Sequence, residues 1–205
     1  GEASPKDYAR AIADGALLAL IATLGLTLMS HEASPILAQL GFISLTFLGS
    51  TTISHKPKKG FTCLFAGALG LGLSGAPSLA FFLSVGSAIL IGTEKNQFSN
   101  KKIFVQLVLA IGFANVLLAS WLNLWKWRII FSPSSWDEQL SLFAWFLWPT
   151  WPFAIWALWQ WRRQWLTTQW SSHLIFPIFF AGFVSITALL IPNSDQTLLL
   201  ALPSV

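Results

Sequence analysis

The sequence predicts an all-α protein, a polytopic bundle of transmembrane helices. Of its 205 residues, 55% are hydrophobic and only 10% are charged, whereas a soluble domain carries about 25% charged residues. So little polar surface could not cover so apolar a chain in water, and lipid is therefore the predicted solvent. The 12 Trp residues agree, because indole favours the lipid–water interface. The single Cys excludes an intramolecular disulfide, and the modest positive charge indicates membrane topology and no nucleic-acid partner.

A helix needs about 20 apolar residues to cross the hydrocarbon core, or somewhat fewer when it is short and surrounded by protein. Seven apolar stretches meet this requirement. In chain order they are residues 11–30, 35–54, 61–74, 76–92, 102–122, 141–161 and 173–191. An eighth stretch begins near Thr197. We therefore predict one transmembrane domain over residues 1–205, and we expect it to be an internal fragment of a longer protein or, alternatively, a trimmed form.

The third and fourth stretches adjoin each other with no charged segment between them. Residues 61–92 are apolar throughout, too long for one crossing and short for two. The sequence from Ser74 to Ser78 interrupts the run with Gly75 and Pro77. Glycine tolerates a tight turn, and proline suits the first turn of a helix. Two short helices joined by a turn are predicted, in preference to one long kinked helix.

The basic clusters set the predicted orientation. With the hairpin, the clusters before the first helix and after the second, fourth and sixth fall on one face, which the positive-inside rule makes cytoplasmic. With a single helix at 61–92, they would fall on opposite faces. The clusters are Lys6 and Arg10, His55–Lys59, Lys95–Lys102, and Arg162 with Arg163. The segments around His31 and at 123–141 are therefore predicted on the opposite, outer face.

Few residues in the apolar stretches carry chemistry. No phosphate loop, nucleophile elbow or metal-ligand spacing is present, so no metal site is expected. Gly70, Gly72 and Gly75 are interpreted as helix-packing residues because they lie in an apolar run. Asp14 is expected near the cytoplasmic end of the first helix, while Gln106 and Asn115 are uncharged and can be satisfied by neighbouring helices.

Two pairs of residues are candidate sites on the outer face. His31 and Glu32 follow the first helix and could line an outer cavity that holds a polar substrate, or form a polar turn before Pro35. Lys126 and Arg128 lie outside, against the charge rule, and could bind a lipid phosphate, or simply be solvated. The tryptophans from Trp145 to Trp161 are interpreted as an interfacial anchoring belt, with a sugar-stacking platform as the alternative.

Three motifs resemble the bacterial membrane glycosyltransferases of the protein O-mannosyltransferase and aminoarabinose-transferase type, which have the GT-C fold. Residues 7–10 with 31–40 are similar to a middle section of these proteins, 70–77 to their short helical hairpin, and 146–159 with Arg162 and Arg163 to their aromatic-proline helix. The chain departs from many relatives at Ser74, where they have a basic residue, and at Asp195–Thr197, where they have an Arg-Tyr pair.

The resemblance implies a location in the bacterial inner membrane, with the segments around His31 and at 123–141 in the periplasm. It also implies an enzyme that transfers a sugar from a polyprenyl-phosphate carrier to a lipid, glycan or protein acceptor on the periplasmic face. The leading catalytic acid of the family lies in an outer loop that no segment here matches, so no catalytic residue is assigned and the isolated fragment is expected to be inactive. The expected partners are membrane lipids, the polyprenyl-phosphate sugar that serves as donor, and the acceptor; no covalently bound cofactor is expected, and the sequence leaves open a divalent metal. The alternative is a transporter, a flippase or a non-catalytic membrane protein.

Overall fold

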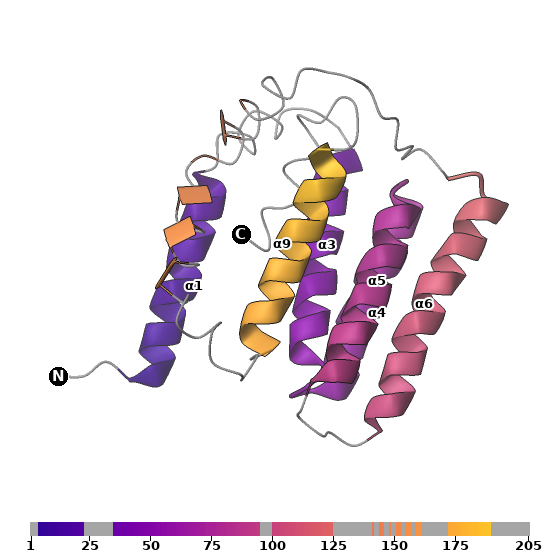
Figure 1. Cartoon of the computed structure of the whole chain (residues 1–205), viewed down its shortest axis with the longest axis horizontal. Helices are drawn as coiled ribbons and strands as arrows, with labels where there is room; N and C mark the ends of the chain where they lie inside the picture. Colours follow the sequence, from indigo (N-terminus) through magenta and orange to yellow (C-terminus); the bar gives the residue numbers. More distant parts are fainter. Residues whose placement is uncertain are drawn as a thin grey trace.

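The described part of the chain is helical. The computed structural model describes residues 4–22, 35–94, 100–124 and 172–189, with isolated residues between 141 and 160. No strand occurs in these ranges, which confirms the all-α class (Figure 1). The helices are α1 (Pro5–Ile21), α3 (Pro35–Thr52), α4 (Pro57–Leu73), α5 (Pro77–Thr93), α6 (Lys101–Trp121) and α9 (Ser172–Leu189).

Helices α3, α4, α5, α6 and α9 form an antiparallel bundle (Figure 1). Helix α4 packs against α3, α5 and α6, and α5 also packs along α6. Helix α9 lies across α3 and α5, where the ring of Phe180 meets Phe47 at 5.2 Å and the ring of Phe183 meets Phe82 at 5.6 Å. Most of the buried residues of α4 are glycine or alanine, and these small residues let three helices pack closely around it.

Helix α1 begins earlier than the apolar pattern predicts. The hydroxyl of Ser4 donates to the Asp7 carboxylate at 2.7 Å and accepts from the Asp7 backbone N–H at 3.3 Å, while Pro5 occupies the first helical position. This reciprocal cap starts the helix at Pro5. Lys6 and Arg10 therefore lie inside the first helix and not before it, and Asp14 lies in the middle of the described helix. The continuation expected to residue 30 falls outside the described residues.

The predicted hairpin at 61–92 is confirmed. The backbone N–H of Gly75 donates to Gly72 O at 3.3 Å, and that of Ala76 donates to Leu71 O at 3.1 Å, the bonding pattern of a Schellman helix end. Gly75 has φ 91°, a backbone conformation that favours glycine. Pro77 then opens α5 at its first turn. The long-helix alternative is excluded because two antiparallel helices meet at this turn.

Glycines bring α3 and α4 into backbone contact. A Cβ added to Gly49 would lie 2.3 Å from Leu64 N, and one added to Gly60 would lie 2.5 Å from Ile53 Cα. A Cβ at Gly67 would lie 2.6 Å from Thr46 N. Small residues that let helix backbones approach are the usual packing device of membrane helices. The packing role predicted for Gly70 and Gly72 is likewise confirmed, since added Cβ atoms there would meet Phe42 and Asn115. For Gly75 this interpretation is wrong, because it lies in the turn between α4 and α5.

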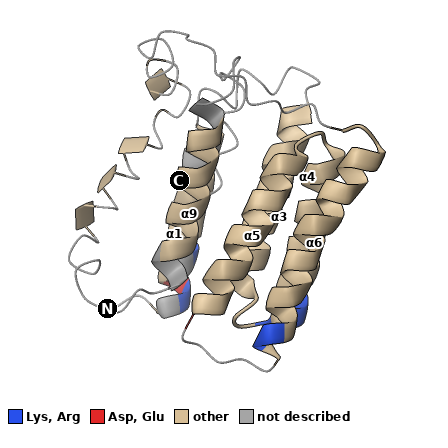
Figure 2. Cartoon of the chain, turned by 45° about the vertical axis from the view of Figure 1, so that its right-hand side comes forward, with Lys and Arg blue, Asp and Glu red and all other residues tan. Residues whose placement is uncertain are grey.

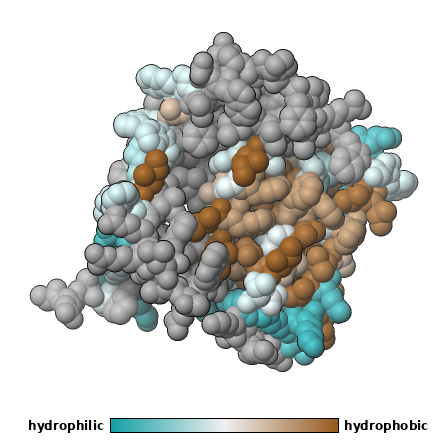
Figure 3. All heavy atoms as spheres, viewed as in Figure 1, coloured by the Kyte–Doolittle hydropathy of each residue, from teal (hydrophilic) through white to brown (hydrophobic). Residues whose placement is uncertain are grey.

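The surface of the bundle is apolar between its ends. Large side chains on the outward faces are exposed, such as Phe82 at 47%, Phe113 at 58% and Leu117 at 72%, and Figure 3 shows this apolar band. Helices α3 and α6, with 18 and 21 residues, are long and apolar enough to cross a membrane, and α5 and residues 175–187 are shorter apolar helices. The structure thus supports membrane association by length and composition.

Candidate functional site

The charged side chains of the antiparallel helices lie at one end of the bundle. Helices α3 and α5 end there and α4 and α6 begin there, as Figure 2 shows for the blue residues. The opposite end holds the Gly75 turn, the start of α3 and the end of α6, and its described residues carry no Lys, Arg, Asp or Glu. We call the first end the basic end; in the described bundle its charged residues are Lys56, Lys58, Lys59, Glu94, Lys101 and Lys102.

Two hydrogen bonds join the helices at the basic end. The hydroxyl of Ser54, which is 8% exposed, donates to the carboxylate of Glu94. The ammonium of Lys101 donates to the backbone carbonyl of Glu94 at the end of α5, where a cation also complements the helix dipole. These contacts fix the ends of α3 and α5 against the start of α6.

The interior polar side chains of the described bundle are hydroxyls and amides. Ser50 on α3 and Ser87 on α5, both fully buried, share a hydrogen bond of 2.9 Å. Ser50 also donates to Thr46 O of its own helix at 2.8 Å. Hydroxyl pairs of this kind link helices in an apolar medium. They carry no charge, so they serve as helix contacts and not as acid–base groups.

Two buried amides flank the hairpin turn near the uncharged end. Gln39 on α3 is 2% exposed and donates from Nε2 to Ser74 O at 3.0 Å. Asn115 on α6 is fully buried and donates from Nδ2 to Ile111 O at 3.0 Å, while its Oδ1 faces Gly72. The amide oxygens of both residues lack a hydrogen-bond partner. Gln39 thus holds the turn to α3, and Asn115 packs against the last turn of α4.

Gln39 was not predicted as a contact between helices, although a Gln in an apolar run is a signal that could have identified it. Gln106 and Asn115 were predicted to be satisfied by neighbouring helices. Asn115 bonds within its own helix, and Gln106 is exposed on α6. Asn115 is buried because the absence of a side chain at Gly72 makes room for it.

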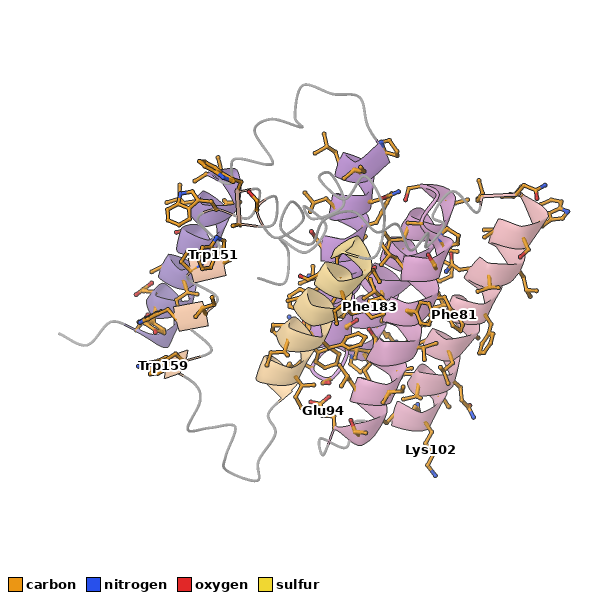
Figure 4. All side chains as sticks on the ribbon, turned by 45° about the horizontal axis from the view of Figure 1, so that its top comes forward. Phe81, Glu94, Lys102, Trp151, Trp159 and Phe183 are labelled. Carbon is orange, nitrogen blue, oxygen red and sulfur yellow. The ribbon has the colours of Figure 1, made fainter. Side chains whose placement is uncertain are left out.

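The candidate pairs His31 and Glu32, and Lys126 and Arg128, lie outside the described residues. The nearest described residues are Pro35, at the start of α3, and Leu124, after α6, and both are at the uncharged end. Several isolated residues of the predicted 141–161 helix are helical, and Trp145, Trp156 and Trp159 are more than half exposed (Figure 4 labels Trp159). Exposed indoles are compatible with an anchoring belt and with a sugar-stacking platform, so the anchoring role stays a prediction.

The described geometry contains helix contacts and a basic end, and it assembles no acid–base or nucleophilic centre. In the described ranges, no group of three His, Cys, Asp or Glu side chains could hold a metal ion. Comparison with known proteins gave no match to a family model, to a curated protein or to a solved structure.

Proposed function

We propose that the chain is a multi-pass domain of a bacterial inner membrane, with α3, α4, α5 and α6 each crossing once and the basic end in the cytoplasm. The observation that carries this proposal is the placement of the charged residues of these four helices at one end, with exposed apolar side chains along the flanks. Water would not favour such a surface, whereas lipid would. The positive-inside rule then gives the orientation.

The lengths of the hairpin helices are compatible with this proposal. Helices α4 and α5 have 17 residues each, or about 26 Å at 1.5 Å per residue, against a hydrocarbon core of about 30 Å. Much of α4 is shielded by α3, α5 and α6, so its lipid contact is limited. The further crossings expected at 11–30, 141–161 and 173–191 complete the proposed seven, with an eighth beginning near Thr197.

Cysteine labelling in intact cells tests the orientation. In a Cys63→Ser background, Lys58→Cys and Lys102→Cys are expected to resist a membrane-impermeant maleimide, because both positions face the cytoplasm. Ser78→Cys, just after the hairpin turn, is expected to label from outside. The same variants in inverted vesicles are the control, where Lys58→Cys and Lys102→Cys should react. Labelling of these two positions in intact cells would reverse the proposed topology.

The proposed activity is transfer of a sugar from a polyprenyl-phosphate carrier to an acceptor at the periplasmic face, as part of a glycosyltransferase of the GT-C type. Two features support it. The hairpin at 70–77, which resembles the short hairpin of those enzymes, forms a Schellman turn at the uncharged end. Pro35 at the start of α3 and Leu124 after α6 also lie at that end. The carrier phosphate and the acceptor are proposed to meet there, with His31, Glu32, Lys126 and Arg128 as the candidate residues.

Analysis of lipid-linked sugars tests the activity. Deletion of the gene is expected to raise the level of one polyprenyl-phosphate sugar and to remove one sugar from the cell envelope, because the donor is no longer consumed. Both changes should revert when the gene is restored. The measurement is mass spectrometry of extracted lipids and envelope glycans. Unchanged polyprenyl-phosphate sugars with altered distribution of a different solute would instead favour a transporter.

A further inference from the structure

Lysines of two adjacent helices border one seam at the basic end. Lys58 and Lys59 lie in the first turn of α4, and Lys102 lies in the first turn of α6. Two residues after Lys59 and Lys102, the rings of Phe61 and Phe104 meet at 6.0 Å and join these two helices. We call the surface formed by these five residues the α4–α6 seam. All three of its lysines are exposed, and Lys102 points away from the bundle in Figure 4.

Exposed apolar side chains continue from the seam along both helices. They include Phe65 on α4, at 44% exposed, and Ile103 and Leu107 on α6, at 52% and 41%. A surface with lysines at the membrane edge and apolar side chains deeper in is complementary to a phospholipid, whose phosphate lies at the membrane surface and whose acyl chains lie in the hydrocarbon.

The charge at this end is unbalanced among the described residues. The described bundle has one carboxylate at this end, that of Glu94, against five lysines: Lys56, Lys58, Lys59, Lys101 and Lys102. That carboxylate accepts the hydroxyl of Ser54, and Lys101 donates to the Glu94 backbone carbonyl. The lysines of the seam therefore keep an excess of positive charge at the level where lipid headgroups lie.

We propose that the α4–α6 seam binds an anionic phospholipid of the cytoplasmic leaflet, such as phosphatidylglycerol. The headgroup phosphate lies at the level of Lys58, Lys59 and Lys102, at the basic ends of the two helices, and the acyl chains lie against Phe65, Ile103 and Leu107. An ammonium group binds phosphate as a point charge, and lysines near an anionic membrane surface contribute additively to the attraction. The inference rests on the proposed membrane location and goes beyond it by naming the lipid class and the residues that select it.

Native mass spectrometry of the full chain, released from nanodiscs that contain equal phosphatidylglycerol and phosphatidylcholine, tests the inference. The wild type is expected to retain phosphatidylglycerol preferentially. Lys58→Gln/Lys102→Gln should reduce that preference by about fivefold for each lysine removed. Added inorganic phosphate at constant ionic strength should displace little lipid, because the acyl chains contribute to binding; full displacement would show a site for free phosphate and would overturn the proposal.

The matched control is Lys6→Gln/Arg10→Gln, which removes the same charge from α1 and leaves the seam intact. This variant should keep the preference of the wild type. Equal losses in the two variants would show a general effect of net charge and would refute a defined seam. Failure here is separable from failure of the proposed topology: a chain that labels with the cytoplasmic pattern yet binds both lipids equally disproves the seam alone.

Discussion

Replacing Gly49 with alanine is expected to destabilise the bundle by about 3 kcal/mol, the upper part of the usual range for overpacking a close contact. The added Cβ would lie 2.3 Å from Leu64 N and 2.7 Å from both Gly60 O and Leu64 Cα. These are backbone atoms of α4, which no side-chain rotation can move away. The two helices must separate, and the Ser50–Ser87 contact one residue further along α3 should weaken with them.

Gly41→Ala on the same helix is the matched control, because a Cβ at Gly41 meets nothing within 4 Å. Alanine there should be neutral or stabilise by up to about 1 kcal/mol, since it favours the helix more than glycine does. The measurement is reversible unfolding in mixed detergent micelles, followed by circular dichroism. Similar stabilities for the two variants would contradict the close approach of α3 and α4.

Replacing Asn115 with aspartate is expected to cost about 3 kcal/mol or more, the price of leaving a buried charge unpaired. Asn115 is fully buried, and its Nδ2 donates to Ile111 O at 3.0 Å. A carboxylate of the same shape would lose that donor and place negative charge beside a carbonyl oxygen. The described residues around it, Ile111 and Gly72, offer no side-chain cation in compensation.

Two variants separate the charge from the loss of packing. Asn115→Ala removes the amide and leaves no new charge, so it should cost only about 1 kcal/mol. Gln106→Glu adds a charge on the exposed face of α6, four residues from Lys102. It should cost less than Asn115→Asp, because the side chain is near the end of the helix, can reach the interface and has a lysine within reach. If Asn115→Asp is no more harmful than Asn115→Ala, the amide is not sealed inside the bundle as the structure describes.

The sequence by itself determined the helical class, the starts of α3 and α6, and the hairpin. Apolar length marks a helix in lipid because every backbone group must be bonded within the segment. Gly75 and Pro77 predicted the turn because their effect on the backbone is local. Glycine tolerates a positive φ, and proline lacks the N–H that a position inside a helix would use. The clustering of lysines at one end followed from that turn, since it sets the direction of every later helix.

Other features were decided by tertiary structure. The start of α1 was missed because a cap of Ser4, Pro5 and Asp7 extends the helix through a charged stretch that hydropathy does not count. The roles of Gln39 and Asn115 depend on which helices face them, and Gly72 gives Asn115 its place only because α4 and α6 are neighbours. Hydropathy measures the preference of each segment for lipid. These contacts instead arise between segments that are far apart in the chain. The packing of one helix backbone against another decides which polar group is buried, and hydropathy does not describe that packing.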